Sequence, residues 1–94
     1  MNPSKEAKDL YEKARKYIDG MRYEKAIETL NQILIKAPND VKAICDLCLV
    51  HARLGFKELS EEKVFLLAKK ALKLNDQLPL DYLSIPYDIF KERN

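Results

Sequence analysis

The sequence predicts an all-α fold in which four helices form two antiparallel pairs, followed by an apolar tail. The first observation is spacing, because Leu10, Ala14 and Tyr17 recur at the three- and four-residue steps that mark one face of a helix. The second is that this pattern returns 34 residues later, with the following residues in the corresponding positions: Ile44, Cys48 and His51. The third is that no stretch alternates as a strand would.

The first two helices have clear start and stop signals. Asn2 can cap a helix over residues 3–19, with a proline at the first position where the missing N–H costs nothing, and Gly20 ends it. The second helix is predicted over residues 22–37, because residues that precede a proline, here Pro38, avoid helical geometry.

The third and fourth helices have similar signals. Asn39 and Asp40 offer a cap for a helix over residues 41–54, and Gly55 follows as its stop. Ser60 can cap a fourth helix, which has two glutamates in its first turn and is expected to end near Asn75.

The second helix of each pair also repeats, at an offset of 38 residues. Its corresponding residues are Ala26, Leu30 and Ile33 in the first pair and Val64, Ala68 and Ala71 in the second. Four extra residues must therefore lie between the third and fourth helices, and residues 55–59 are the natural place because loops accept insertions at little cost.

The spacing of Leu10, Ala14, Tyr17, Ala26, Leu30 and Pro38 resembles that of the tetratricopeptide repeat family, whose units are two helices about 34 residues long. The resemblance implies a single domain over residues 1–94, with one repeat over 7–40 and a second over 41–78. These repeats would stack into a short right-handed superhelix. It also implies a noncatalytic binding module, because the family acts mainly by gripping other chains.

In this family the first helix of each pair lines a concave groove, so the resemblance makes one face of the first and third helices the candidate binding surface. The candidate residues form an apolar floor with basic flanks: Lys8, Tyr11, Arg15, Ile18, Lys42, Cys45, Leu49 and Arg53. One subfamily binds a C-terminal carboxylate of chaperones through Lys and Asn side chains. The matching positions here hold Tyr11, Arg15 and Asp46, so that clamp is not expected.

The tail over residues 79–94 carries large apolar residues, and its two prolines forbid one continuous helix. One interpretation is a kinked cap that covers the apolar edge of the second repeat, since stacked repeats need polar ends. The other is a docking segment that assembles homo-oligomers or binds a partner, because Leu83, Tyr87 and Phe90 share one helical face. Self-association through this tail is the alternative to an adaptor or scaffold that binds a peptide or helix in the groove.

The cluster Cys45, Cys48 and His51 is the one constellation that suggests chemistry. Three ligands without a fourth make a poor structural zinc site, and a redox pair would need a βαβ context. The repeat already explains Cys48 and His51 as core positions. We therefore predict two buried thiols, no metal and no cofactor. With no glycine-rich phosphate loop and no further histidine, we expect no catalytic residues and no enzyme activity.

Composition narrows the partners to proteins or peptides. The net charge is +2 and Lys and Glu are mixed along the chain, whereas nucleic-acid binders concentrate basic residues on one face. The apolar runs are far too short for a membrane span. No apolar leader opens the sequence, so we expect a cytoplasmic protein.

Overall fold

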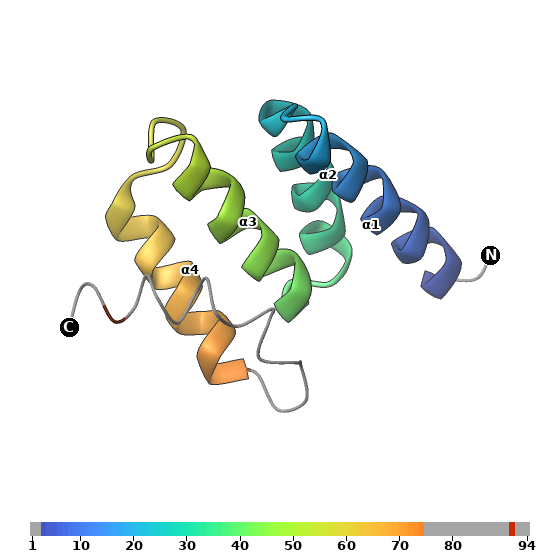
Figure 1. The fold of residues 1–94 in the computed structure, drawn as a ribbon. Coiled ribbons are helices and arrows are strands. Elements are labelled where there is room, and N and C mark those ends of the chain that lie inside the picture. Colours follow the sequence, from blue (N-terminus) through green and yellow to red (C-terminus); the bar gives the residue numbers. More distant parts are fainter. Residues whose placement is uncertain (1–2, 75–90, 92–94) are drawn as a thin grey trace.

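The computed structural model describes residues 3–74 and Lys91. Within that part the chain forms four helices and no strand: α1 (Pro3–Asp19), α2 (Tyr23–Lys36), α3 (Val41–Arg53) and α4 (Glu61–Leu74) (Figure 1). The all-α prediction is confirmed, and each helix bound lies within one residue of its predicted place. The predicted cap Asn2 and the tail over 79–94, apart from Lys91, lie outside the described residues.

Two of the predicted N-terminal caps form hydrogen bonds. Asp40 Oδ1 accepts a hydrogen bond from the backbone N–H of Ala43 at 3.1 Å, at the start of α3. Ser60 Oγ accepts one from the N–H of Lys63 at 3.3 Å, at the start of α4. These side chains satisfy backbone donors that the first helical turn leaves without a partner, so they fix where each helix begins.

Helices α1 and α3 each end in a turn of the same type. In this turn, two backbone N–H groups donate hydrogen bonds back to carbonyl groups of the last helical turn. Arg22 N–H donates to the Tyr17 carbonyl at 2.7 Å, and Phe56 N–H donates to the His51 carbonyl at 2.9 Å. Such a turn needs one residue in the left-handed conformation. Gly55 takes this role after α3 with φ of 66°, but after α1 it falls to Met21 with φ of 59°. Gly20 was predicted as the stop, yet the left-handed residue is the one that follows it.

The left-handed position yields a prediction from two opposite substitutions. Met21→Gly should raise the free energy of unfolding by up to about 1 kcal/mol, because a side chain at positive φ is strained and Met21 is 73% exposed, so little packing is lost. Gly55→Ala should lower it by about 1 kcal/mol for the same reason, although no atom would crowd the new methyl group. Urea unfolding of both variants measures this. If the free energy of unfolding shifted equally and with the same sign in both variants, the assignment of Met21 and Gly55 as the left-handed residues would be wrong.

The two helix pairs pack in chain order: α1 on α2, α3 on α4, and α2 on α3 between the pairs (Figure 1). Among the residues that correspond between the two repeats, Leu10 and Tyr17 are only half-buried and pack against the core cluster of α1, α2 and α3. The other ten are buried, as predicted. In the first repeat these are Ala14, Ala26, Leu30 and Ile33, and in the second Ile44, Cys48, His51, Val64, Ala68 and Ala71. Small residues at these places allow close approach of the helices, and the larger ones fill the space between them.

The four extra residues of the second repeat lie where they were predicted. Residues 20–22 join α1 to α2, whereas residues 54–60 join α3 to α4, which makes seven residues against three. The helix pairs keep their packing because the insertion is confined to this turn.

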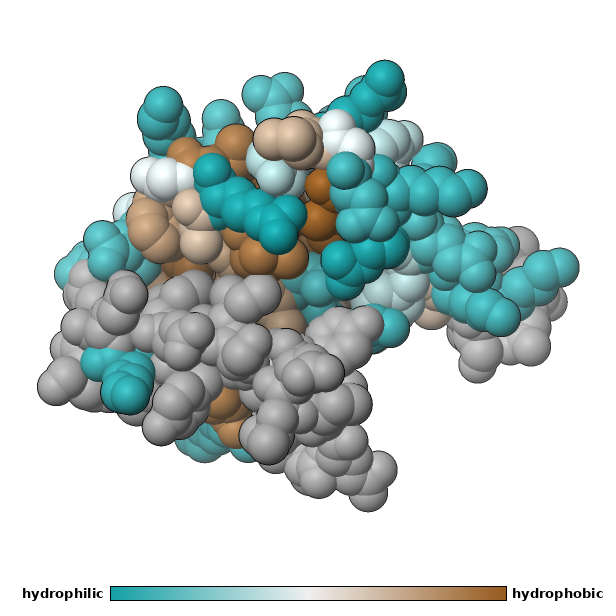
Figure 2. Space-filling model, viewed as in Figure 1, coloured by the Kyte–Doolittle hydropathy of each residue, from teal (hydrophilic) through white to brown (hydrophobic). Residues whose placement is uncertain are grey.

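The third helix is the centre of the described part of the molecule, since it packs on both α2 and α4. As a result, the six consecutive residues from Ala43 to Cys48 are all buried. On the face drawn in Figure 2, the described side chains are mostly hydrophilic, with a smaller group of hydrophobic ones among them. Among the described residues, no helix is long and apolar enough to cross a membrane.

Candidate binding groove between α1 and α3

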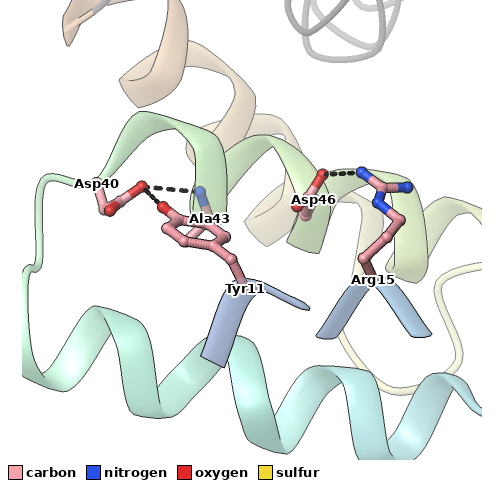
Figure 3. A network of polar contacts seen from close by, with 5 residues as sticks. All are labelled: Tyr11, Arg15, Asp40, Ala43 and Asp46. Atoms are coloured by element: carbon pink, nitrogen blue, oxygen red, sulfur yellow. Dashed lines mark hydrogen bonds and ion pairs between the residues drawn. The ribbon is translucent and has the colours of Figure 1, made fainter. Parts of the chain in front are cut away.

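A hollow of about 410 Å³ lies between α1 and α3, and three of the predicted groove residues line it. Its lining consists of Tyr11, Glu12, Arg15, Lys16, Lys42 and Asp46. Tyr11 and Arg15 point from α1 toward α3 in Figure 3. The hollow therefore carries three cationic and two acidic side chains around one aromatic ring. We refer to it below as the α1–α3 groove.

The predicted groove is wrong at two residues, which are buried in the core. Ile18 and Cys45 are each only 2% exposed, so neither presents a side chain to a binding surface. Ile18 belongs to the core cluster that joins α1, α2 and α3, whereas Cys45 packs with Ile44 and Ala71 between α3 and α4. Cys45 is buried because α3 is covered by both α2 and α4, and Ile18 because the core side of α1 faces both α2 and α3.

The other three predicted residues lie outside the lining. Leu49 is half-buried and packs against the core cluster of α1, α2 and α3. Lys8 and Arg53 are exposed. The groove is thus narrower than predicted and more polar, because its apolar floor reduces to the ring of Tyr11.

One corner of the α1–α3 groove is fixed by Asp40. The hydroxyl of Tyr11 donates a hydrogen bond to Asp40 Oδ1, the oxygen that also accepts the N–H of Ala43 (Figure 3). Lys42 Nζ lies 4.9 Å from the centroid of the Tyr11 ring, within the range of a cation–π interaction. Burial and the hydrogen bond to Asp40 raise the pKa of Tyr11 well above its ordinary value, so the phenol stays protonated and remains a donor.

Asp46 gives the α1–α3 groove a nearly buried carboxylate. Its Oδ1 lies 3.5 Å from Arg15 Nη2, and its side chain is 9% exposed against 44% for that of Arg15 (Figure 3). Burial raises the pKa of Asp46 above its ordinary value, although Arg15 and Lys42 act in the opposite direction. Burial therefore outweighs the attraction of the two cations, and the ionised carboxylate is held at a cost.

This pKa shift predicts an unusual dependence of stability on pH. Because the folded chain holds the Asp46 proton more tightly than the unfolded chain does, the contribution of Asp46 to stability is full below the ordinary pKa of aspartate. That contribution is lost as pH rises through the raised pKa of the folded state. The unfolding free energy of the parent minus that of Asp46→Asn should therefore fall as pH rises from about 3 to 7. Urea unfolding at each pH measures it. A rising difference would mean that the ion pair with Arg15 dominates.

The cluster of Cys45, Cys48 and His51 is part of the core. Both cysteines are free and buried, as predicted. Burial raises the pKa of Cys45 to about 11 and that of Cys48 to about 12, so both thiols are protonated and poorly nucleophilic at neutral pH. Among the described residues, no three His, Cys, Asp or Glu side chains are placed to hold a metal ion.

Three residues of the α1–α3 groove were absent from the predicted set, namely Glu12, Lys16 and Asp46. Asp46 could have been found, because it follows Lys42 by four residues and so lies on the same face of α3. The two residues from α1 could not, since their place depends on how α1 is rotated against α3.

Comparisons with known proteins give no relative for this chain. No family model, no curated protein and no solved structure matches it. The fold and the groove are therefore interpreted from the chain's own residues.

Proposed function

We propose that this protein is a noncatalytic interaction module of the tetratricopeptide repeat type, which binds a peptide or helix of a partner protein in the α1–α3 groove. The observation that carries the proposal is that Tyr11, Arg15 and Lys42, three of the predicted groove residues, line one hollow. In tetratricopeptide repeat proteins, which the sequence resembles, the first helix of each repeat contributes to the binding face. In the two repeats proposed here, these first helices are α1 and α3.

The side chains of the α1–α3 groove favour a partner with acidic groups. Lys16 is exposed, and Lys42 lies over the Tyr11 ring at the edge of the hollow. Of the two acidic residues, Asp46 is nearly buried beside Arg15 and only Glu12 is exposed, so the three cations outnumber the outward acidic charge of the groove. Asp or Glu side chains of a bound segment would pair with these cations, and an apolar side chain beside them would cover the Tyr11 ring. The mixed charge of the whole chain supports a protein partner rather than nucleic acid.

We place this activity in the cytoplasm. Two free cysteines, Cys45 and Cys48, fit a compartment that keeps thiols reduced. An adaptor or scaffold role fits the α1–α3 groove, because its cations can pair with acidic groups and its Tyr11 ring can be covered by an apolar side chain.

The test is selection of peptides on the intact protein, followed by affinity measurements with two charge-matched variants. Lys16→Ala with Lys42→Ala removes two cations from the α1–α3 groove and leaves the Arg15–Asp46 pair in place. Lys13→Ala with Lys69→Ala removes two exposed cations outside its lining. Selected peptides should be rich in Asp and Glu, and should bind the first variant about tenfold more weakly and the second as well as the parent. Equal binding to all three proteins would refute the proposal.

A further inference from the structure

A second hollow, of about 610 Å³, lies between α2 and α4 across α3. Five apolar side chains form its floor: Ile27, Leu34, Leu47, Leu59 and Leu67. Its other lining residues are Glu24, Glu28, Asn31, His51 and Glu58. On α3, Leu47 and His51 lie on a different side from Lys42 and Asp46, given 100° of rotation per residue. This second hollow is therefore separate from the α1–α3 groove. We refer to it below as the acidic hollow, because its charged lining residues are all glutamates.

The charge of the acidic hollow is opposite to that of the chain. Three glutamates and no lysine or arginine line it, whereas the whole chain carries a net charge of +2. All three glutamates are exposed, and within the described part of the chain none of them forms a salt bridge. Their carboxylates thus surround apolar surface, and no cation among the described residues forms an ion pair with them.

The floor also holds a polar group that lacks a partner. His51 is 5% exposed, and its Nδ1 atom is buried with no hydrogen-bond partner among the described residues. Burial lowers the pKa of His51, although the nearby Glu58 opposes this, so the imidazole is neutral at pH 7. A buried polar atom without a partner costs free energy.

We propose that the acidic hollow binds a basic amphipathic segment of a partner protein, with a large apolar side chain on the leucine floor and flanking Lys or Arg side chains on the glutamates. Charge complementarity selects this occupant, because three unpaired carboxylates repel an acidic segment and attract a basic one. The chain's own residues 75–94 carry four acidic and two basic residues, so their net charge is negative and on charge they are a poorer occupant. This site does not depend on the function proposed for the α1–α3 groove.

The test uses the full-length protein and a short amphipathic peptide that has leucines on one helical face and lysines beside them. A second peptide replaces each lysine with glutamate. Glu28→Lys with Glu58→Lys reverses two charges at the acidic hollow, and Asp9→Lys with Asp19→Lys makes the same change of net charge at exposed sites on α1. Fluorescence titration gives the affinities. Amide chemical-shift mapping on the parent protein locates the bound peptide without any substitution.

The lysine peptide should bind the parent and the Asp9/Asp19 variant equally, and bind the Glu28/Glu58 variant at least about tenfold more weakly. Shift changes should be centred on α2, residues 58–59 and α4. Three outcomes would overturn the proposal: equal affinity for the two peptides, equal weakening in both variants, or shift changes centred on the α1–α3 groove. Circular dichroism spectra of both variants test whether they are folded, so that a lower affinity can be distinguished from a loss of structure.

Discussion

Replacing Ala26 with glutamate is expected to unfold the protein at neutral pH. Ala26 is fully buried in the core cluster that joins α1, α2 and α3. A carboxylate at this place would be desolvated without a partner and would also overpack the contact between helices, and together these effects cost several kcal/mol. The whole stability of a typical domain is only about 5–15 kcal/mol, so the loss is comparable with the total.

A matched control for this variant lies in the same helix. Ile35 is 80% exposed on α2, so Ile35→Glu introduces the same charge without burying it and should leave the unfolding free energy nearly unchanged. Circular dichroism spectra and thermal melts of the two variants measure the contrast. A cooperative melt of Ala26→Glu at the parent temperature would mean that α1 and α2 do not pack as described.

Leu30→Ala is expected to lower the free energy of unfolding by about 2–5 kcal/mol. Leu30 is fully buried, and its truncation both loses transfer free energy and leaves a cavity that the packed helices can fill only in part. The loss should be toward the upper end of that range, because Leu30 lies in the cluster that also joins α2 to α3 and so connects the two pairs.

The control is the same substitution at an exposed leucine. Leu66 is 60% exposed on α4, so Leu66→Ala should change the free energy of unfolding by less than about 0.5 kcal/mol. Urea unfolding of the parent and both variants gives the three values under one condition. Equal losses for Leu30 and Leu66 would show that burial in the first repeat is misassigned.

The helix bounds were predictable because the chain marks them with residues whose local effect is strong. Pro38 ends α2 whatever surrounds it, and the side chains of Asp40 and Ser60 reach the first free N–H groups of their own helices. Each of these effects acts within four residues, so no knowledge of the tertiary structure is needed. The left-handed turn at Met21 was missed because glycine is the usual residue there, and Gly20 stands one position away.

The candidate site was less predictable, because the surface of α3 is decided by its neighbours. Helical spacing divides a helix into an inner and an outer face, and this division suits one that packs on one side. Since α3 is covered by both α2 and α4, Cys45 is buried although it lies off the core stripe. Ile18 was misplaced for a similar reason, because the core side of α1 extends from α2 to α3.

Asp46 was missed for the same reason, although in this case the residue that the neighbouring helices bury is polar. An aspartate within a helix is ordinarily predicted to be exposed. Here the neighbouring helices cover it, and Arg15 of α1 lies beside its carboxylate. Such a pair depends on the rotation and separation of two helices, which the spacing of apolar residues along each one does not specify.

The carboxylate of Asp40 has a consequence for how this protein can change. One oxygen both starts α3 and holds the Tyr11 hydroxyl of the α1–α3 groove. Any substitution at Asp40 that alters the width of the groove therefore also loosens the first turn of α3. Affinity and folding are coupled at this corner, so variants with new partner preferences should arise more readily at Lys16 than at Asp40 or Tyr11. The groove thus has one adaptable edge and one edge that selection for stability holds constant.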